Sequence, residues 1–292
     1  MRTAGLVTID WGTTNRRIFL LDSDGAVVRR EADSLGVTAV PPGGFPVEMA
    51  RLRDRFGDVP FLLAGMIGSN RGWAEAPYIA CPVTLARLRD SLLWVEPGRT
   101  AIIPGACVDG ARADVMRGEE VQLLGAVATG LVAPDALLCL PGTHAKWARV
   151  ADGALVDFRT VMTGEMFALL RNHSLLAPQL SCDVADGPAF RDGVAQGLGG
   201  ALLSDLFGTR ARILLGRLQA EEAASYVSGL LLGADLRIGL DDASEGSIGL
   251  IGEPALTRLY GAALDEAGRS HQEVDGERAF LAGIHVIAKD LG

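Results

Sequence analysis

The sequence predicts an α/β protein made of two related halves, and three observations lead to this fold class. Apolar stretches typical of β-strands alternate with helical stretches along the chain. The length of 292 residues exceeds that of one average domain and suits two. Residues 136–156 repeat the pattern of residues 6–28, which indicates that one strand-and-turn unit occurs twice.

Each copy of this repeat contains an apolar strand, a Gly-Thr turn, a second strand and an Asp-Gly turn. The Gly-Thr turns begin at Gly12 and Gly142, and the Asp-Gly turns begin at Asp24 and Asp152. Such dipeptides are common in ordinary hairpins, but the strands on both sides favour a true repeat. We therefore predict an N-terminal domain over residues 1–132 and a C-terminal domain over residues 133–292.

In the first half, β-favouring stretches bounded by turn residues predict strands at residues 6–10, 17–21, 26–31, 60–64 and 101–104. Helices are expected at residues 47–56, 84–94 and 119–129. Residues 65–82 have no clear period, and a connection of that length is usually functional or disordered. Its Met66, Trp73 and Tyr78 argue against disorder, so we expect a functional loop.

The second half reads as strands followed by mostly helical chain. After the repeated strands, we expect helices at residues 164–176, 192–210, 215–240, 255–268 and 276–290, and a strand at 247–251. Pro254 suits the first turn of the helix that follows that strand, because a proline there lacks only an N–H that has no helical partner.

Composition and charge exclude several classes of protein. Apolar residues make up 49% of the chain and charged residues 22%, which excludes an intrinsically disordered protein. The chain has 36 acidic and 27 basic residues, and its net charge of −9 is opposite to that of a non-specific nucleic-acid binder or a polybasic membrane binder. We therefore expect neither nucleic acid nor a membrane as partner.

Targeting segments and metal-ligand spacings are not found in the sequence. Residues 1–10 lack the pattern of a secretory signal, and no apolar run approaches the roughly 18 residues of a membrane span, so a cytoplasmic protein is expected. The four cysteines and four histidines are scattered without the CxxC or HExxH spacings of a metal site.

The Gly-Thr turns offer chemistry for binding phosphate. Backbone amides and the hydroxyls of Thr13 and Thr14 can hold phosphate oxygens, and Asp10 is placed to hold a divalent cation. The second copy has Leu140 where the first has Asp10, so only one turn carries the carboxylate. That asymmetry fits one nucleoside triphosphate held by both turns better than two independent sites.

Several longer strings resemble one family. They are DWGTTN at residues 10–15, GMIGS at 65–69, RGW at 71–73, EAPY at 75–78, DVMRGEE at 114–120, LPGTH at 140–144, KW at 146–147 and MTGE at 162–165. These strings are similar to the 2-dehydro-3-deoxygalactonokinase family of the actin, sugar-kinase and chaperone-ATPase superfamily. The resemblance implies two ribonuclease-H-like (actin-like ATPase) domains, each with a mixed sheet flanked by helices, and a cleft between them.

The resemblance also implies an activity and its cofactors. The expected reaction is ATP-dependent phosphorylation of the terminal (C6) hydroxyl of 2-dehydro-3-deoxy-D-galactonate in galactonate breakdown. Asp10 would bind Mg2+. The implied phosphate ligands are Gly12, Thr13, Thr14, Asn15, Gly142, Thr143 and Lys146, and the implied adenosine ligands are Gly229, Gly233, Gly252 and Pro254.

The resemblance also implies a catalytic base near the start of the helix that closes the first half, where three acids compete. They are Asp114, ranked first because superfamily bases are usually Asp, then Glu119, and Glu120. All three also suit a helix N-terminus, where the helix dipole stabilises a carboxylate. Arg71, with Arg117 as its rival, is the candidate for the substrate carboxylate. The remaining candidates for substrate binding are Ser69, Asn70 and Glu75.

Two alternatives to this function remain open in the sequence. The fold determines how phosphate is bound and not which acceptor molecule is used. A kinase of another small sugar acid or sugar is therefore compatible with the motifs. A non-catalytic ATP-binding regulator is also compatible. A homo-oligomer is neither required nor excluded.

Overall fold

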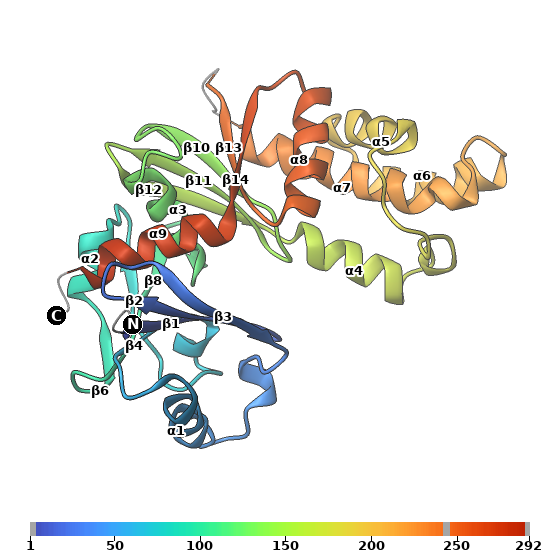
Figure 1. The fold of residues 1–292 in the computed structure, drawn as a ribbon. Coiled ribbons are helices and arrows are strands. Elements are labelled where there is room, and N and C mark those ends of the chain that lie inside the picture. Colours follow the sequence, from blue (N-terminus) through green and yellow to red (C-terminus); the bar gives the residue numbers. More distant parts are fainter. Residues whose placement is uncertain (1–3, 242–245, 290–292) are drawn as a thin grey trace. The chain divides into compact units, whose positions relative to one another are not determined.

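The computed structural model describes residues 4–241 and 246–289 (Figure 1). The chain divides into two compact units. Unit 1 comprises Met1–Pro134, Asp152–Asp157 and Glu277–Gly292, and unit 2 comprises Asp135–Ala151 and Phe158–Gly276. The sequence placed the last helix in the second domain, whereas its residues from Glu277 onward cluster with unit 1.

Unit 1 contains a six-stranded mixed sheet with the order β3-β2-β1-β4-β7-β6. Its strands are β1 (Ala4–Trp11), β2 (Arg16–Asp22), β3 (Val27–Asp33), β4 (Phe61–Gly65), β6 (Leu93–Glu96) and β7 (Thr100–Ile102). The strands β1, β2 and β3 form an antiparallel meander, whereas β4 runs parallel to both β1 and β7. The parallel pairing brings the carboxyl ends of β1 and β4 to the same edge of the sheet.

The rest of unit 1 consists of a small sheet and four helices. The small sheet has the order β5-β8-β9, with β5 (Tyr78–Ala80), β8 (Gly105–Val108) and β9 (Asp114–Met116). The helices are α1 (Phe45–Phe56), α2 (Leu85–Asp90), α3 (Glu119–Ala128) and α9 (Gly276–Ala288). Two short 3-10 helices lie at Val37–Ala39 and Met66–Gly68.

Successive side chains of the meander point to opposite faces of the large sheet and are buried on both. Ile18 belongs to the cluster that packs against α1, whereas its neighbour Phe19 packs against Phe280 of α9. The helices α3 and α9 touch through glycines, because a Cβ atom at Gly125 would lie 2.2 Å from the carbonyl oxygen of Ala279. Unit 1 therefore has a helix layer on each side of its sheet.

Unit 2 contains a five-stranded sheet with the order β12-β11-β10-β13-β14. Its strands are β10 (Ala136–Leu140), β11 (Ala145–Ala151), β12 (Ala154–Val161), β13 (Ile248–Gly252) and β14 (His271–Asp275). As in unit 1, the first strand pairs antiparallel with the second and parallel with a strand much later in the chain. The prediction of an α/β chain with two related mixed sheets is thus confirmed.

The helices of unit 2 are α4 (Thr163–His173), α5 (Pro188–Leu198), α6 (Leu202–Leu214), α7 (Ala223–Gly239) and α8 (Pro254–Glu266), with 3-10 turns at Ala177–Gln179 and Ala220–Glu222. Figure 1 shows α4, α5 and α6 grouped around the buried helix α7. Among the described residues, no helix combines the length and the apolar character needed to cross a membrane.

Several sequence predictions of elements were wrong. The expected helix at 84–94 ends at Asp90 and gives way to β6, because the β-favouring residues that follow pair with β7. The expected helix at 192–210 is interrupted between α5 and α6, where Gly200 has a φ of +88° that ends helical geometry. The polar strand β14 lacks an apolar pattern and was missed.

Glycines let α5 and α7 approach closely, and this contact predicts the effect of adding a methyl group. A Cβ atom at Gly229 would lie 2.1 Å from the carbonyl oxygen of Phe190, whereas one at Gly208 on α6 would meet no atom within 4 Å. We expect Gly229→Ala to lower the free energy of unfolding by about 1–3 kcal/mol through overpacking. The matched variant Gly208→Ala should raise it by up to about 1 kcal/mol, because alanine favours a helix. Urea denaturation measures both, and equal effects would contradict the close contact.

Candidate active site

The first Gly-Thr turn joins β1 to β2 and is held by the segment that follows β3. The N–H groups of residues 36–38 donate hydrogen bonds to the carbonyl oxygens of Gly12, Thr13 and Thr14, at 3.0–3.3 Å. The hydroxyl of Thr38 donates a further bond to the carbonyl oxygen of Thr13. This segment fixes the orientation of three successive peptide planes in the turn.

The fixed peptide planes determine where the amides of the turn point. In a trans peptide the C=O and N–H groups point in opposite directions. The amides of Thr13, Thr14 and Asn15 therefore point away from residues 36–38, and these three residues are exposed. Successive N–H groups directed outward form an anion-binding concavity, so the turn suits phosphate oxygens.

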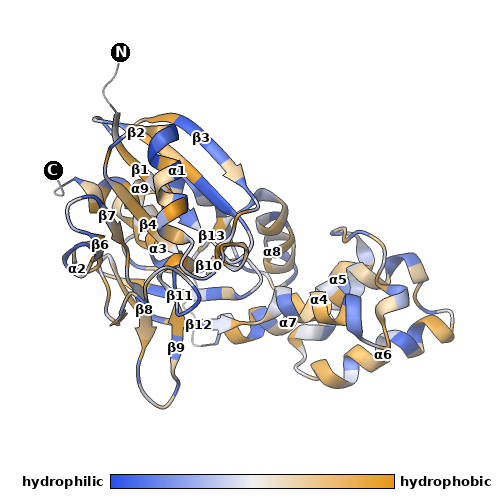
Figure 2. Cartoon of the chain, turned by 90° about the horizontal axis from the view of Figure 1, so that it is seen from below, coloured by the Kyte–Doolittle hydropathy of each residue, from blue (hydrophilic) through white to orange (hydrophobic). Residues whose placement is uncertain are grey.

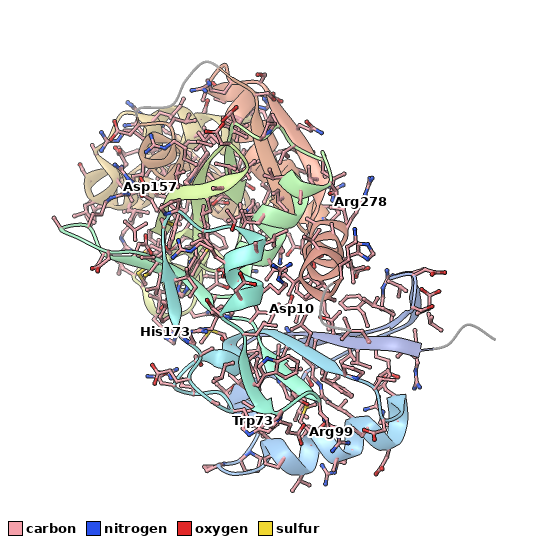
Figure 3. All side chains as sticks on the ribbon, turned by 90° about the vertical axis from the view of Figure 1, so that its left-hand side faces the viewer. Asp10, Trp73, Arg99, Asp157, His173 and Arg278 are labelled. Atoms are coloured by element: carbon pink, nitrogen blue, oxygen red, sulfur yellow. The ribbon has the colours of Figure 1, made fainter. Side chains whose placement is uncertain are left out.

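Asp10 lies next to this turn, one residue before the end of β1 (Figure 3). It pairs with Arg17 on the adjacent strand β2, with 2.6 Å between Nη2 and Oδ2. On the other side it pairs with Ala64 of β4, and a Cβ atom at Gly65 would lie 3.3 Å from its Oδ1. The sequence did not single out Arg17, although its position opposite Asp10 follows from the hairpin register.

The donor set at Asp10 can be compared with the needs of a metal ion. Within residues 4–241 and 246–289, no group of three or more acidic, histidine or cysteine side chains could enclose a metal. Mg2+ needs fewer protein ligands, since it keeps water and binds through one or two carboxylates and substrate phosphates. Asp10, beside a turn whose amides suit phosphate oxygens, fits that requirement.

The start of α3 lies against the end of β4 in unit 1. Gly118 precedes α3 with a φ of +104°, and a Cβ atom there would lie 3.1 Å from the α-carbon of Gly65. Gly65 itself lies against the end of β1, because a Cβ atom added to it would lie 2.8 Å from the carbonyl oxygen of Trp11. Glu119, which follows Gly118, is therefore positioned close to the strand end that carries Asp10.

Two carboxylates at the start of α3 differ in their surroundings. Glu119 is half-buried and accepts a hydrogen bond from the backbone N–H of Arg117 at 3.0 Å. Glu120 is fully buried, and both of its oxygens accept from the N–H of Gly118, at 2.7 and 2.8 Å. Burial, reinforced by the charge of Glu119, raises the pKa of Glu120 to about 8, against the lowering effects of backbone hydrogen bonds and Arg117.

The first-ranked candidate base, Asp114, lies at the start of β9 rather than on α3. It pairs with Val108 in the small sheet, and its carboxylate accepts a hydrogen bond from the N–H of Val115 at 2.7 Å. The glycine contacts that bring the start of α3 to β1 thus involve the neighbours of Glu119 and not those of Asp114.

The loop between β4 and β5 contains the candidate substrate ligands. Asn70, Arg71 and Glu75 are exposed, whereas Ser69 is buried and donates its hydroxyl hydrogen to the carbonyl oxygen of Met66 at 2.7 Å. Trp73 packs against the core of unit 1, as its position in Figure 3 illustrates.

Arg117 contacts the end of this loop that leads into β5. Its Nη2 donates to the carbonyl oxygen of Ala76 at 2.8 Å, and its guanidinium lies 4.2 Å from the ring centre of Tyr78. Its Nε and Nη1 are buried and have no hydrogen-bond partner among the described residues. Arg117, the second candidate for the substrate carboxylate, is thus a buried cation with two hydrogen-bonding nitrogens that have no partner among the described residues.

The second Gly-Thr turn, in unit 2, is held by a helix. The N–H of Glu165 on α4 donates to the carbonyl oxygen of Thr143 at 2.9 Å. A Cβ atom at Gly164 would lie 2.5 Å from the carbonyl oxygen of Gly142, so only glycine fits there. Lys146 follows on β11 and is buried, with 4% of its surface exposed. Gly164 lies in the string MTGE, but sequence reasoning gave it no role.

A buried carboxylate binds side chains of two elements that follow this turn, β11 and α4. Asp235 on α7 accepts hydrogen bonds from Trp147 Nε1 and Thr163 Oγ1, both at 2.6 Å, and from the Tyr260 hydroxyl. Burial raises the pKa of Asp235, and these three hydrogen bonds oppose that effect. The network joins β11, α4 and α8 to α7. An aspartate within a long apolar helical stretch was the signal in the sequence that could have revealed it.

The four candidate adenosine ligands fall into two different environments. Gly252 ends β13, beside Pro141, and a Cβ atom there would meet its nearest atom, on Thr257, at 3.6 Å. Pro254 begins α8, as the sequence predicted. Gly229 and Gly233 instead lie on α7 against the backbone of α5. Of these four, Gly252 is the one whose described contacts include Pro141, the residue before the second Gly-Thr turn.

Comparisons with known proteins agree with the motifs. A family model described as 2-keto-3-deoxy-galactonokinase matches residues 10–287. The chain is 38% identical to a 2-dehydro-3-deoxygalactonokinase of Escherichia coli (strain K12), over 98% of both chains. A crystal structure of a Sinorhizobium meliloti protein described as a 2-dehydro-3-deoxygalactonokinase matches with a TM-score of 0.91 and 35% identity, covering 97% of this chain and 98% of that one.

A more distant match concerns the fold alone. The activator of the 2-hydroxyisocaproyl-CoA dehydratase from Clostridium difficile, determined with bound ADPNP, matches with a TM-score of 0.53 and 11% identity, covering 100% of this chain and 96% of that one. Together with the sheet order of the two units, this likeness confirms the actin-like ATPase fold class expected from the sequence.

The raised pKa of Glu120 predicts a pH dependence of stability. Because its folded-state pKa lies above the ordinary value of 4.5, its contribution to stability is full below about pH 4.5 and is lost as the pH rises through 8. Glu120→Gln mimics the neutral acid and should lose this dependence. The free energy of unfolding of the wild type, relative to that of the variant, should therefore fall between about pH 5 and pH 8, by about 1.4 kcal/mol for each unit of pKa difference.

Urea denaturation at a series of pH values measures this difference. The matched control is Glu75→Gln, which changes an exposed glutamate of the same unit and should leave the pH dependence unaltered. Parallel curves for the wild type and Glu120→Gln would show that Glu120 is ionised in the folded protein.

Proposed function

The chain belongs to the 2-keto-3-deoxy-galactonokinase family, and we propose that it transfers the terminal phosphoryl group of ATP to the C6 hydroxyl of 2-dehydro-3-deoxy-D-galactonate. The observation that carries this proposal is the first Gly-Thr turn, whose amides point outward directly after the strand that carries Asp10. Both ATP and the sugar acid are small metabolites, and we propose a cytoplasmic enzyme acting in galactonate breakdown.

In the proposed mechanism, both Gly-Thr turns bind the phosphates of ATP. Gly12, Thr13, Thr14 and Asn15 supply amides and hydroxyls from unit 1, and Gly142, Thr143 and Lys146 contribute from unit 2. Asp10 would hold Mg2+, which when bound neutralises phosphate charge during transfer. Arg17 orients the Asp10 carboxylate through their ion pair. For adenosine, Gly252 and Pro254 support the proposal better than Gly229 and Gly233, which are occupied by the α5 contact.

We propose Glu119 as the base that accepts the proton of the substrate hydroxyl. It is partly exposed, whereas the fully buried Glu120 cannot touch a substrate and has a pKa of about 8 that favours its neutral form at pH 7. A neutral Glu120 removes one negative charge from the place where phosphate must approach. Its bonds to the Gly118 N–H hold the start of α3 in position.

Recognition of the substrate carboxylate is proposed for a guanidinium group, since it binds a carboxylate through two parallel hydrogen bonds. Arg71 is exposed on the loop after β4, and Asn70 and Glu75 beside it can bind hydroxyl groups. Arg117 stabilises the loop through its hydrogen bond to the carbonyl oxygen of Ala76. Ser69 shapes the turn, because its hydroxyl bonds to the backbone of the same loop.

An assay of ADP formation with two acceptors tests the proposed reaction. We expect rapid turnover with 2-dehydro-3-deoxy-D-galactonate and much slower turnover with the corresponding gluconate-derived acid. Asp10→Asn should abolish transfer, with thermal unfolding unchanged. Turnover with only the second acid would replace the substrate assignment. ATP binding without ADP formation on either acid would identify a regulator instead of an enzyme.

The choice of base is tested by comparing two variants. Glu119→Gln should lower kcat by roughly 100- to 10,000-fold while ATP binding is retained, because a positioned base contributes about that factor. Asp114→Asn should change kcat far less. The reverse order of effects would assign the base to Asp114.

A further inference from the structure

The helix α6 of unit 2 carries an apolar stripe that no part of the described chain covers. Its core-facing side chains are Leu202, Leu206, Thr209 and Ile213. Leu203, Phe207 and Leu214 are 86%, 65% and 73% exposed, and their spacing of four and seven residues places them on one flank of the helix. Leu215, directly after the helix, is 70% exposed. We call Leu203, Phe207, Leu214 and Leu215 the α6 patch.

This patch stands out from the rest of the described surface. Its four members are the four most exposed large hydrophobic side chains in the part of the chain that the structure describes. Figure 2 shows hydrophobic stretches along α6, at the side of unit 2 where the helices gather. Single exposed hydrophobic residues are ordinary, but a contiguous group marks a surface that meets another molecule.

The area of the patch suits an interface between proteins. At roughly 100–200 Å² for each such side chain, the α6 patch presents on the order of 500 Å² of apolar surface. A standard interface buries about 800 Å² on each partner, including its polar rim. The patch is therefore large enough to form the apolar centre of such an interface.

The order of residues along α6 is self-complementary in an antiparallel pairing. If two α6 helices meet around a two-fold axis that passes between residues 208 and 209, Leu203 of each copy faces Leu214 of the other. The same axis places Phe207 opposite Arg210 of the other copy, where a guanidinium can lie on an aromatic ring. Both pairs therefore share one centre, as a two-fold interface requires.

We infer that two copies of this chain form a homodimer through the α6 patch, with the two α6 helices antiparallel. The orientation also places the positive end of each helix dipole beside the negative end of the other. The net charge of −9 opposes an anionic membrane surface as the alternative occupant. The inference does not depend on the proposed reaction, because it rests on α6 alone.

Light scattering after size-exclusion chromatography tests the assembly. The wild type should have twice the 30.6 kDa mass of one chain at micromolar concentration. Phe207→Glu should yield monomers, with an unchanged circular dichroism spectrum because the side chain is exposed. Val47→Glu, which alters a 57% exposed side chain on α1 of unit 1, should remain a dimer. A monomeric wild type, or a dimer that survives Phe207→Glu, would overturn the inference.

Cysteine cross-linking tests the antiparallel register. The double variant Leu203→Cys with Leu214→Cys should form a covalent dimer under mild oxidation, because the two positions face each other across the axis. Leu203→Cys alone should not exceed the wild-type background from the four native cysteines, since its own symmetry mate lies about 16 Å further along the helix. Efficient cross-linking of the single variant would indicate a parallel arrangement, and binding to anionic vesicles would indicate a membrane surface; either result would refute the inference.

Discussion

The contact between the backbones of Gly118 and Gly65 is the constraint on which the candidate site of unit 1 depends. It brings the start of α3 to the end of β4, whose parallel pairing with β1 places both strand ends at one edge. A side chain at Gly118 would push the helix away from Gly65, and one at Gly65 would clash with the carbonyl oxygen of Trp11 on β1. Both glycines also have a positive φ that disfavours other residues. The strand end that carries Asp10 and the helix start that carries Glu119 therefore both lie against Gly65.

The local electrostatics of the candidate site differ from those of the acidic molecule as a whole. The first Gly-Thr turn directs amides outward, and Arg17 pairs with Asp10 beside it. Burial keeps Glu120 largely neutral near pH 7, which removes one negative charge from the start of α3. The net charge of −9 therefore describes the molecule as a whole and not the surroundings of the turn.

The features that the sequence predicted well are those fixed by local chemistry. The strand-turn-strand repeats, the Gly-Thr turns and the helix beginning at Pro254 depend on residues close together in the chain. Other features depend on partners far away in the chain. They are the choice between Asp114 and Glu119, the packing of two helices through Gly229 and Gly233, and the clustering of α9 with unit 1. No periodicity or propensity encodes those partners, so the sequence alone indicates the candidates without distinguishing among them.

The two halves use different physical means to hold the same kind of turn. In unit 1 the turn is tied to the extended segment at residues 36–38, and its charge partner is Asp10 on the preceding strand. In unit 2 the turn is covered by the start of α4, where Gly164 allows direct backbone contact and the Asp235 network fixes the helix. The second half has Leu140 in place of the carboxylate and gains a helix N-terminus, whose partial positive charge favours an anion. The same kind of turn therefore lies beside a carboxylate in unit 1 and beside a helix N-terminus in unit 2.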